Sequence, residues 1–597
     1  GGFDGPGRLP YAVASFFEQG GRRAYVVRIV PDDAGAGRGD GVASGVLRPL
    51  AAAGGEVRLW ARSEGSWGDG LSAELTFDPA PLPVTMLGAA DMVVPSDAPP
   101  PVGSLLRLRL ADTTRVLAWV IGSRVEGDPA APGRRRVVTL DAAPAQDVTA
   151  AELVEATLTI DDGDGRVETH ARLGLDPGHP RALARVLMEE SDLVEPDPAW
   201  WDATVRPGGP GAALGPAVTW SAPAADVPVP GPRAGGFAGG SDRWAAIQPS
   251  DFFDARWVPG DEEPRSGVHA LVDVDDVALV AVPDLYEPAP LAEPESIADV
   301  SLAGPEFREC VDLPPPRPQA PPPPGLDGLA LDPTVGASRA TIVGLQLRLV
   351  ELADLLRSWI VLLDVPPGLG PSGALKWRAS FDSAWAAAFH PWLRVARPDD
   401  RRGGAVEVNP SALAAGIAAR RALRDGVQYG PANELAARVV DVRERVDPAA
   451  HADLHPAGIN VFLREPDGVR LSAARTLARD PQWRQLSVRR LVSMLERALQ
   501  HELDWVVFEP NTASLRADVD HLIRAYLRRL YRANAFVGAG EDEAFFVRCD
   551  DTLNPAPVVD AGQLVAEIGV APAEPLEFIV LRLARGGDGT LLVEAAR

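Results

Sequence analysis

The chain has 597 residues, of which 46% are hydrophobic and 24% charged, a composition typical of folded domains and not of a disordered chain. Its 58 basic and 83 acidic residues give a net charge of −25, which argues against nucleic acid or anionic membrane as a partner, because phosphate contacts need a supply of Lys and Arg. Lys376 is the single lysine and lies in Ala-Leu-Lys-Trp, so a P-loop, which ends in Lys-Ser or Lys-Thr, is excluded.

The N-terminal segment predicts a helix followed by strands. Residues 9–19 (LPYAVASFFEQ) have apolar side chains at helical spacing, and the glycines at 20 and 21 are typical of a helix end. Residues 24–30 (AYVVRIV) are β-branched and aromatic, as in a buried strand. Two further strands are expected at residues 57–61 and 71–77.

Short strands and turns dominate the next part of the chain. Residues 105–110 (LLRLRL), 116–121 and 136–140 predict strands joined by turns rich in Pro and Gly, which indicates a small inserted β-domain. Residues 157–175 continue in β-character around an acidic turn at residues 161–165 (DDGDG). This turn does not have the spacing of an EF-hand loop, so we interpret it as a solvated hairpin turn.

Proline is concentrated in two stretches. They are residues 198–240 and residues 313–325 (LPPPRPQAPPPPG), and the second should be extended and semi-rigid. We interpret the second stretch as a spacer or surface loop; a ligand for a proline-binding domain is the alternative.

The last part of the chain has the most regular pattern. Residues 487–501 and 514–532 predict two amphipathic helices, separated by a short buried strand at residues 505–508. Residues 576–583 and 590–594 predict two terminal strands that flank the turn GGDG.

The sequence contains no recognisable catalytic, metal-binding or cofactor-binding motif. The eight histidines do not follow the spacing of a zinc site, and neither a nucleophile elbow nor a dinucleotide-binding turn occurs in its usual context. Cys310 and Cys549 lie far apart, which argues against a disulfide framework and indicates a reducing compartment. No signal peptide is visible, and no apolar run reaches the roughly 18 residues of a membrane span. We expect no catalytic residue, cofactor or metal ion.

A series of short phrases runs through nearly the whole chain. They are residues 16–28 (FFEQGGRRAYVVR), 64–71 (EGSWGDGL), 237–242 (FAGGSD), 276–283 (DVALVAVP), 363–367 (LDVPP), 390–392 (HPW), 431–433 (PAN), 458–460 (GIN), 474–477 (ARTL), 488–491 (VRRL), 507–511 (VFEPN), 545–550 (FFVRCD), 571–572 (AP) and 576–579 (LEFI). In this order they resemble contractile tail sheath proteins. Asp69 stands where that family usually has Asn. The family also has an extended arm before the first phrase, so the arm is either absent or outside the numbered chain.

The resemblance implies a multidomain α+β fold with a mixed α/β core, built from the N-terminal segment and the C-terminal half. We predict five parts: residues 1–78 as the N-terminal part of the core, 79–150 as the inserted β-domain, 151–330 as a middle domain with Pro/Gly-rich loops, 331–475 as core, and 476–597 as a tube-facing C-terminal domain with an arm strand.

The resemblance also implies a structural function. Such proteins stack as six-membered rings around an inner tube, between baseplate and cap proteins, and contract to drive the tube through a target envelope. We expect assembly in the cytoplasm of the producing bacterium, as an injection system or, alternatively, a phage virion tail; nucleic acid and direct membrane insertion are not expected. The two rival classes are an enzyme and a non-contractile binding scaffold.

Two candidate assembly sites follow from the family's architecture. The first is an exchanged strand at the C-terminus, since terminal arms that complete a neighbour's sheet keep subunits tethered while they slide. Its residues are Thr590, Leu591, Leu592, Val593 and Glu594. The alternative is a hairpin strand folded on its own domain.

The second candidate is a basic helix face within residues 514–532, which carries five arginines against two aspartates. Its residues are Arg516, Arg524, Arg528, Arg529 and Arg532. The hypothesis is that this face holds an acidic stripe on the tube, through contacts that are individually weak and therefore releasable. A solvated polar helix face is the alternative.

Overall fold

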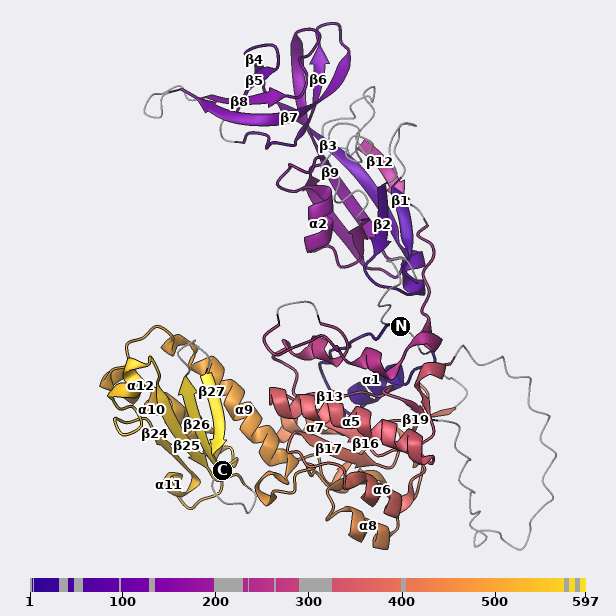
Figure 1. Cartoon of the computed structure of the whole chain (residues 1–597), viewed down its shortest axis with the longest axis vertical. Coiled ribbons are helices and arrows are strands. Elements are labelled where there is room, and N and C mark those ends of the chain that lie inside the picture. The colour runs from indigo at the N-terminus through magenta and orange to yellow at the C-terminus, as the bar shows by residue number, and fades with distance from the viewer. Residues whose placement is uncertain are drawn as a thin grey trace, which may run out of the picture. The chain divides into compact units, whose positions relative to one another are not determined.

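The computed structural model describes residues 3, 5–31, 41–47, 57–95, 98–127, 135–197, 229–234, 236–261, 265–288, 325–398, 404–573, 579–585 and 591–596; in 229–234, 579–585 and 591–596 it describes the backbone alone. The chain divides by its contacts into two compact units (Figure 1). Unit 1 comprises residues 1–31 and 244–597, and unit 2 comprises residues 32–243. Both contain helices and several sheets, so the expected mixed α/β class is confirmed.

Unit 1 contains a six-stranded sheet in the order β13-β16-β17-β22-β23-β20, in which β13 to β22 are parallel. Every residue of β16 and β17 is buried, as expected for strands that are covered on both faces. The elements of this part are α1 (Leu9–Glu18), β13 (Leu279–Ala281), β14 (Glu287–Pro288), β15 (Ala330–Leu331), α5 (Gly336–Leu356), β16 (Ile360–Asp364), α6 (Gly370–Arg378), β17 (Ala386–His390), β18 (Leu393–Ala396), β19 (Ala405–Val408), α7 (Pro410–Asp425), β20 (Glu434–Leu435), β21 (Val439–Val442), α8 (Pro448–Leu454), β22 (Ile459–Glu465) and β23 (Gly468–Leu471).

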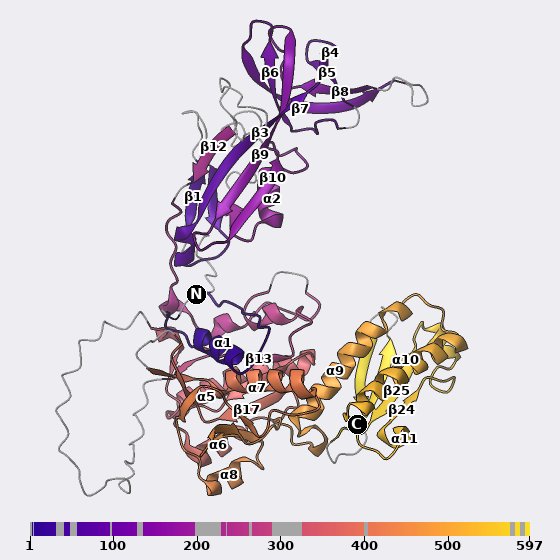
Figure 2. The same ribbon diagram turned by 180° about the vertical axis from the view of Figure 1, so that it is seen from behind.

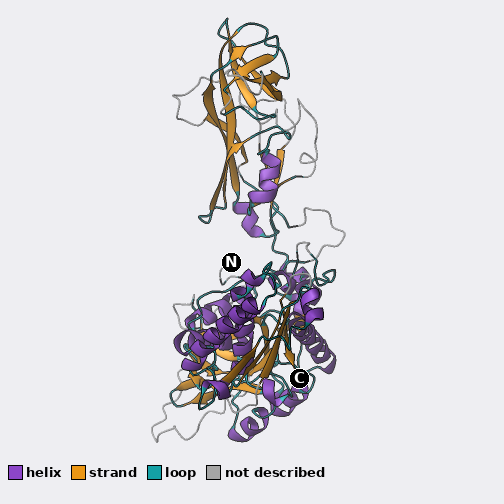
Figure 3. Ribbon diagram, turned by 90° about the vertical axis from the view of Figure 1, so that its left-hand side faces the viewer, coloured by secondary structure: helices purple, strands orange, loops and turns teal. Residues whose placement is uncertain are grey.

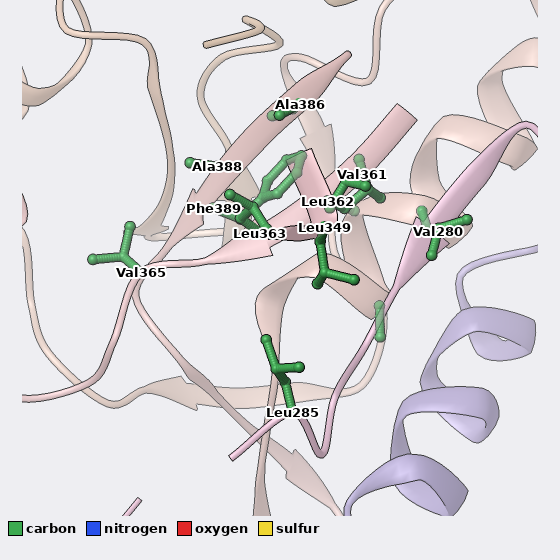
Figure 4. Close-up of a cluster of buried hydrophobic side chains, with 14 of the residues drawn as sticks. Val280, Leu285, Leu349, Val361, Leu362, Leu363, Val365, Ala386, Ala388 and Phe389 are labelled. Carbon is green, nitrogen blue, oxygen red and sulfur yellow. The ribbon is translucent and has the colours of Figure 1, made fainter. Parts of the chain in front are cut away.

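Aliphatic and aromatic side chains from these strands and helices form the main core. In Figure 4, Leu363 of β16 and Phe389 of β17 lie in one cluster with Leu349 of α5. Each such side chain contributes about 1.5–3 kcal/mol when fully buried.

Helix α1 is fixed to this core at both of its ends. At its start, Asp284 accepts hydrogen bonds from the backbone N–H groups of Arg8 at 2.6 Å and Leu9 at 3.0 Å. Near its end, the Gln19 side chain donates to the Ala437 carbonyl and accepts from the Ala437 N–H, both at 2.8 Å. The N-terminal segment is therefore part of unit 1, although the whole of unit 2 separates it from α7 in sequence.

A buried carboxylate fixes the start of α7 to the end of β16. Asp364 accepts hydrogen bonds from the Ser411 N–H and hydroxyl, both at 2.8 Å, and from the Asn409 side chain at 3.1 Å. Desolvation outweighs these bonds and raises the pKa of Asp364 to about 6. The folded chain therefore binds this proton more tightly than the unfolded chain, whose Asp has a pKa of about 3.9.

We therefore expect the Asp364 carboxyl to favour the folded state increasingly as the pH falls from 7 to 5. In urea unfolding at pH 5, 6 and 7, the unfolding free energy of the wild type relative to Asp364→Asn should rise by about 1 kcal/mol between pH 7 and pH 5. Because the wild type and the variant share all other titrating groups, the difference between their unfolding free energies reports on Asp364 alone. A difference that stays constant, or that falls with decreasing pH, would contradict the assignment.

Unit 2 is mostly β-sheet, with helix α2 packed against β11 and β10 (Figure 3). Its long strands β3 and β9 pair from Ser72↔Asp161 to Leu82↔Ala151 and connect two separate cores. One of these cores is formed by residues from Leu82 to Ala151. The elements are β1 (Ser44–Leu47), β2 (Val57–Ala61), η1 (Ser66–Gly70), β3 (Ser72–Leu82), β4 (Thr85–Met86), β5 (Asp91–Val94), β6 (Leu105–Leu110), β7 (Arg115–Glu126), β8 (Arg135–Leu140), β9 (Val148–Asp161), β10 (Val167–Leu173), α2 (Leu183–Glu190), β11 (Val194–Pro196) and β12 (Val229–Ala234).

The end of unit 1 forms a C-terminal domain, in which two long helices pack on one face of a four-stranded sheet (Figure 2). The sheet order is β24-β25-β26-β27, and all its pairs are antiparallel. The elements are α9 (Leu486–Glu502), the short 3-10 helix η8 (Asp504–Val506), α10 (Ala513–Arg532), α11 (Glu541–Ala544), β24 (Phe545–Arg548), α12 (Ala556–Asp560), β25 (Val565–Val570), β26 (Ile579–Arg585) and β27 (Leu591–Ala596).

Most predicted elements are confirmed, but two predicted strands are wrong. Residues 24–30 have no regular structure, and Tyr25 and Val26 are exposed, because no neighbouring strand pairs with this segment among the described residues. Residues 505–508 are not a strand either. The buried side chains there, Leu503 and Val506, are three residues apart, which is the spacing of the observed 3-10 turn.

Other predictions fall partly outside the described residues or remain open. Residues 161–165 form the expected hairpin turn between β9 and β10. Most of the two proline-rich stretches, together with Cys310, Thr590 and residues 574–578 and 586–589, lies outside the described residues. The predicted boundaries at 78, 150, 330 and 475 stay a prediction, since the two units are defined by contacts and not by a role in an assembly.

Candidate assembly site

Helix α10, which carries the predicted basic face, packs on the sheet of the C-terminal domain. It begins where the Thr512 side chain accepts a hydrogen bond from the Leu515 N–H at 3.2 Å. One side of the helix is buried in the domain core. The buried apolar residues of α10 are Leu515, Val519, Ile523 and Leu527. Residues on the opposite side are therefore presented to solvent.

The structure divides the five predicted arginines into two groups. Three of them bond to acceptors of their own domain. Arg516 is buried and donates to Asn511 at 2.7 Å and to Asp551 at 2.5 Å. Arg524 bonds to Asp520 at 2.6 Å and to the Val547 carbonyl, and Arg528 bonds to Glu541 at 2.8 Å. These three guanidinium groups are thus largely neutralised within the chain.

The other two arginines, Arg529 and Arg532, are exposed at the C-terminal end of α10. The Arg529 guanidinium lies 4.8 Å from the centre of the Tyr526 ring, which orients it without removing its charge. The sequence pattern identified the arginines of the helix but not the acceptors Asp551 and Glu541, which come from other elements. The exposed basic face is therefore narrower than the pattern indicated.

The predicted terminal strand lies at an edge of the four-stranded sheet. In β27, residues 591–596 pair with β26 from Arg585↔Leu591 to Val580↔Ala596. Here the strand pairs with its own chain, as in the hairpin alternative. The same ladder could form with β26 of another copy, because a backbone ladder does not depend on which chain supplies the strand.

The described residues include few groups suited to chemistry. Burial raises the pKa of the Cys549 thiol to about 11 and lowers the pKa of His390 to about 4, so both are uncharged at neutral pH. Within the described ranges, no three or more His, Cys, Asp or Glu residues form a group that could hold a metal ion. No described helix has both the length and the apolar character that a membrane span needs.

Comparison with known proteins identifies the family. The model of the phage tail sheath C-terminal domain matches residues 478–584. A putative prophage major tail sheath protein of Pseudomonas aeruginosa is 28% identical over 238 residues, which are 38% of this chain and 59% of that protein. The tail sheath protein of Vibrio phage KVP40 is 35% identical over 97 residues, which are 16% of this chain and 14% of that protein.

A solved structure is also similar in sequence to this chain. The helical sheath of the anti-feeding prophage in its contracted state is 30% identical, and the match covers 42% of this chain and 67% of that chain, with a TM-score of 0.35. The chain belongs to the contractile tail sheath protein family. It spans 14% and 59% of the lengths of the two curated relatives.

Proposed function

We propose that this protein is the sheath subunit of a contractile, phage-tail-like injection system. The observation that carries the proposal is the identity of 30% over 67% of the anti-feeding prophage sheath chain, together with the sheath domain match at residues 478–584. The role is structural and not enzymatic: the subunit stores energy in an extended lattice and contracts to drive an inner tube through a target envelope.

An injection system is the first candidate, and the sheath of a phage virion tail is the second. The sheath of the extracellular contractile injection system PVC is 27% identical across 37% of this chain, and the anti-feeding prophage sheath covers 42%. The match to the prophage tail sheath protein of Pseudomonas aeruginosa covers 38%, and the phage KVP40 match covers 16%. A non-contractile binding scaffold would have no reason to share this domain.

The proposed partners are further copies of the chain in stacked six-membered rings, the inner tube, and baseplate and cap proteins. Residues 476–597 face the tube, and the β-domain at 79–150 is an elaboration of the core. Assembly takes place in the cytoplasm of the producing bacterium. Contraction requires contacts with two alternative arrangements and a tether that survives the change.

Negative-stain electron microscopy of the purified chain, expressed with and without its tube protein, tests the proposal. Hollow, helically striated cylinders of two lengths and widths are the expected result. Monodisperse globular particles under every condition, including those in which the chain carries an added N-terminal arm from a relative, would contradict it.

We expect that deletion of residues 590–594 abolishes sheath assembly while the chain remains folded. The strand is at a sheet edge, so its loss removes a tether without opening the core around Ile568 and Val519. Cylinder formation is measured by electron microscopy, and folding by circular dichroism. Intact cylinders from the truncated chain would favour the hairpin alternative.

We expect the double variant Arg529→Glu and Arg532→Glu to lose co-assembly with the tube. Both side chains are exposed, so reversal of their charge changes the surface without opening the fold. The control is Arg185→Glu with Arg256→Glu, which makes the same change in net charge at exposed sites away from α10. Co-assembly with the tube is measured by co-sedimentation in low and high salt. If it is unaffected in the first variant, a contact between this helix face and the tube is ruled out.

A further inference from the structure

The turn between α9 and α10 exposes two aromatic side chains. Phe508 is completely exposed and has a φ of +75°, a left-handed backbone conformation that bulky residues rarely adopt. Trp505 is 46% exposed. Large exposed aromatic side chains of this kind are typical anchors of protein interfaces. We call residues 502–511 the aromatic turn.

The aromatic turn is held rigidly by its own domain. Leu503 and Val506 are buried in the core of the C-terminal domain. The Asn511 side chain donates to the Gln563 carbonyl at 2.8 Å, and the Thr512 N–H donates to the Pro510 carbonyl at 2.8 Å. The backbone that carries Phe508 is thus held in place before any partner binds, and such preorganisation reduces the entropy lost on binding.

The aromatic turn is also acidic. Glu502, Asp504 and Glu509 are exposed, and residues 502–511 contain neither Lys nor Arg. A partner surface for this turn should therefore be apolar at its centre and basic around it.

A second surface of unit 1 has these properties. Its exposed apolar side chains are Leu423, Tyr429, Leu435 and Val440. Leu423 is 56% and Val440 54% exposed. Residues 418–440 contain four arginines and two acidic residues, in a chain with a net charge of −25. Arg420, Arg421 and Arg424 share Glu434 and Asp425, and Arg438 pairs with Glu18, so the surface is basic through its excess of arginine and not through unpaired charges. We call residues 418–440 the receiving surface.

Contacts within the receiving surface hold its parts together. Arg424 donates to Glu434 at 2.8 Å, and Arg420 donates to the Leu435 carbonyl at 3.0 Å. The Arg421 guanidinium lies 5.9 Å from the centre of the Tyr429 ring. The end of α7, which carries Leu423, therefore lies beside the β20 segment, which carries Leu435.

The two surfaces are at opposite ends of α10. The aromatic turn directly precedes this helix, whereas the Gln428 side chain of the receiving surface donates to the carbonyl of Ala533, just after the helix ends, at 2.9 Å. A helix of 20 residues is about 30 Å long. Phe508 therefore cannot reach the receiving surface of its own chain, and a contact between the two must join two copies head to tail. Such contacts repeat around a ring or along a helix.

We propose that the aromatic turn of one copy docks on the receiving surface of a second copy, with Phe508 inserted between Leu423 and Leu435. This inference rests on the proposed sheath function and specifies one of its contacts between subunits. The aromatic side chains supply the apolar burial, and the carboxylates of the turn face the arginines around it.

Photo-crosslinking of full-length chain with p-benzoylphenylalanine at position 508 tests the contact. Unlabelled chain that carries the probe is mixed with ¹⁵N-labelled chain that lacks it, assembled, irradiated and mapped by mass spectrometry. An adduct between probe-bearing peptide and labelled residues 418–440 is expected. Adducts confined to other regions, to the tube protein or to the same copy, or no adduct, would overturn the inference.

A matched pair of variants gives a second measurement. Phe508→Ala should lower the yield of cylinders at least tenfold at a fixed protein concentration, with unchanged circular dichroism and melting temperature. Val258→Ala, which truncates another exposed apolar side chain, should leave the yield unchanged. Normal cylinders in which position 508 forms no adduct would contradict the docking contact but not the proposed sheath function. An adduct from position 508 without cylinders would contradict the sheath function but not the docking contact.

Discussion

Replacement of Arg489 by alanine is expected to lower the free energy of unfolding by about 3–5 kcal/mol. Arg489 is 4% exposed, and its guanidinium lies between the rings of Trp385 and Trp483, 4.0 and 4.5 Å from their centres. It also donates to Glu496 at 3.1 Å. Burial raises the pKa of Glu496, so truncation leaves this partly buried carboxylate without its counter-charge, and both cation–π contacts are lost.

Urea unfolding of the full-length chain at neutral pH measures this loss. The control is Arg479→Ala, because Arg479 and its partner Asp382 are both exposed and their pair should contribute less than about 1 kcal/mol. Arg489→Lys keeps the charge but loses the planar stacking, and we expect an intermediate loss. A loss for Arg489→Ala no larger than that of the control would show that this contact does not fix α9 to the α/β core.

Replacement of Gly416 by alanine is expected to destabilise the chain by about 1–3 kcal/mol, although alanine is the better helix former. A Cβ atom at Gly416 in α7 would lie 2.5 Å from the carbonyl oxygen of Phe16 and 2.6 Å from Cβ of Gln19. Helix α1 would have to move away from α7, and the paired hydrogen bonds between Gln19 and Ala437 would weaken.

Gly344→Ala in α5 is the control for this experiment, since a Cβ atom there meets no atom within 4 Å. It should stabilise the chain by up to about 1 kcal/mol through helix propensity. Limited proteolysis between α1 and unit 2 should be faster in Gly416→Ala and unchanged in Gly344→Ala. A gain in stability at both positions would mean that α1 and α7 do not pack as closely as described.

Elements with strong local patterns were predictable. Residues 487–501 and 514–532 have apolar side chains at helical spacing, and they form α9 and α10 within one or two residues of the expected ends. Residues 105–110 form β6 as predicted. In these segments, the spacing of apolar residues in the sequence matches the spacing of the positions that face the core.

The two wrong strands have a common cause. Residues 24–30 and 505–508 are apolar enough for a strand, but a strand also needs a neighbouring backbone, and neither segment has one among the described residues. In the second segment, the short path from α9 to α10 requires a 3-10 turn, which leaves Phe508 outside. Exposure of this aromatic side chain was the feature that the sequence interpretation missed.

The sequence by itself determined the family, because the order of its short phrases survives even where each phrase is weak, and it determined the helices and strands whose patterns are local. Tertiary structure alone decided which arginines of α10 are available, since Asp551 and Glu541 reach Arg516 and Arg528 from other elements. It also decided that α1 belongs with α7 and that Phe508 is exposed. These properties depend on contacts between residues far apart in the chain, and a local pattern carries no information about such contacts.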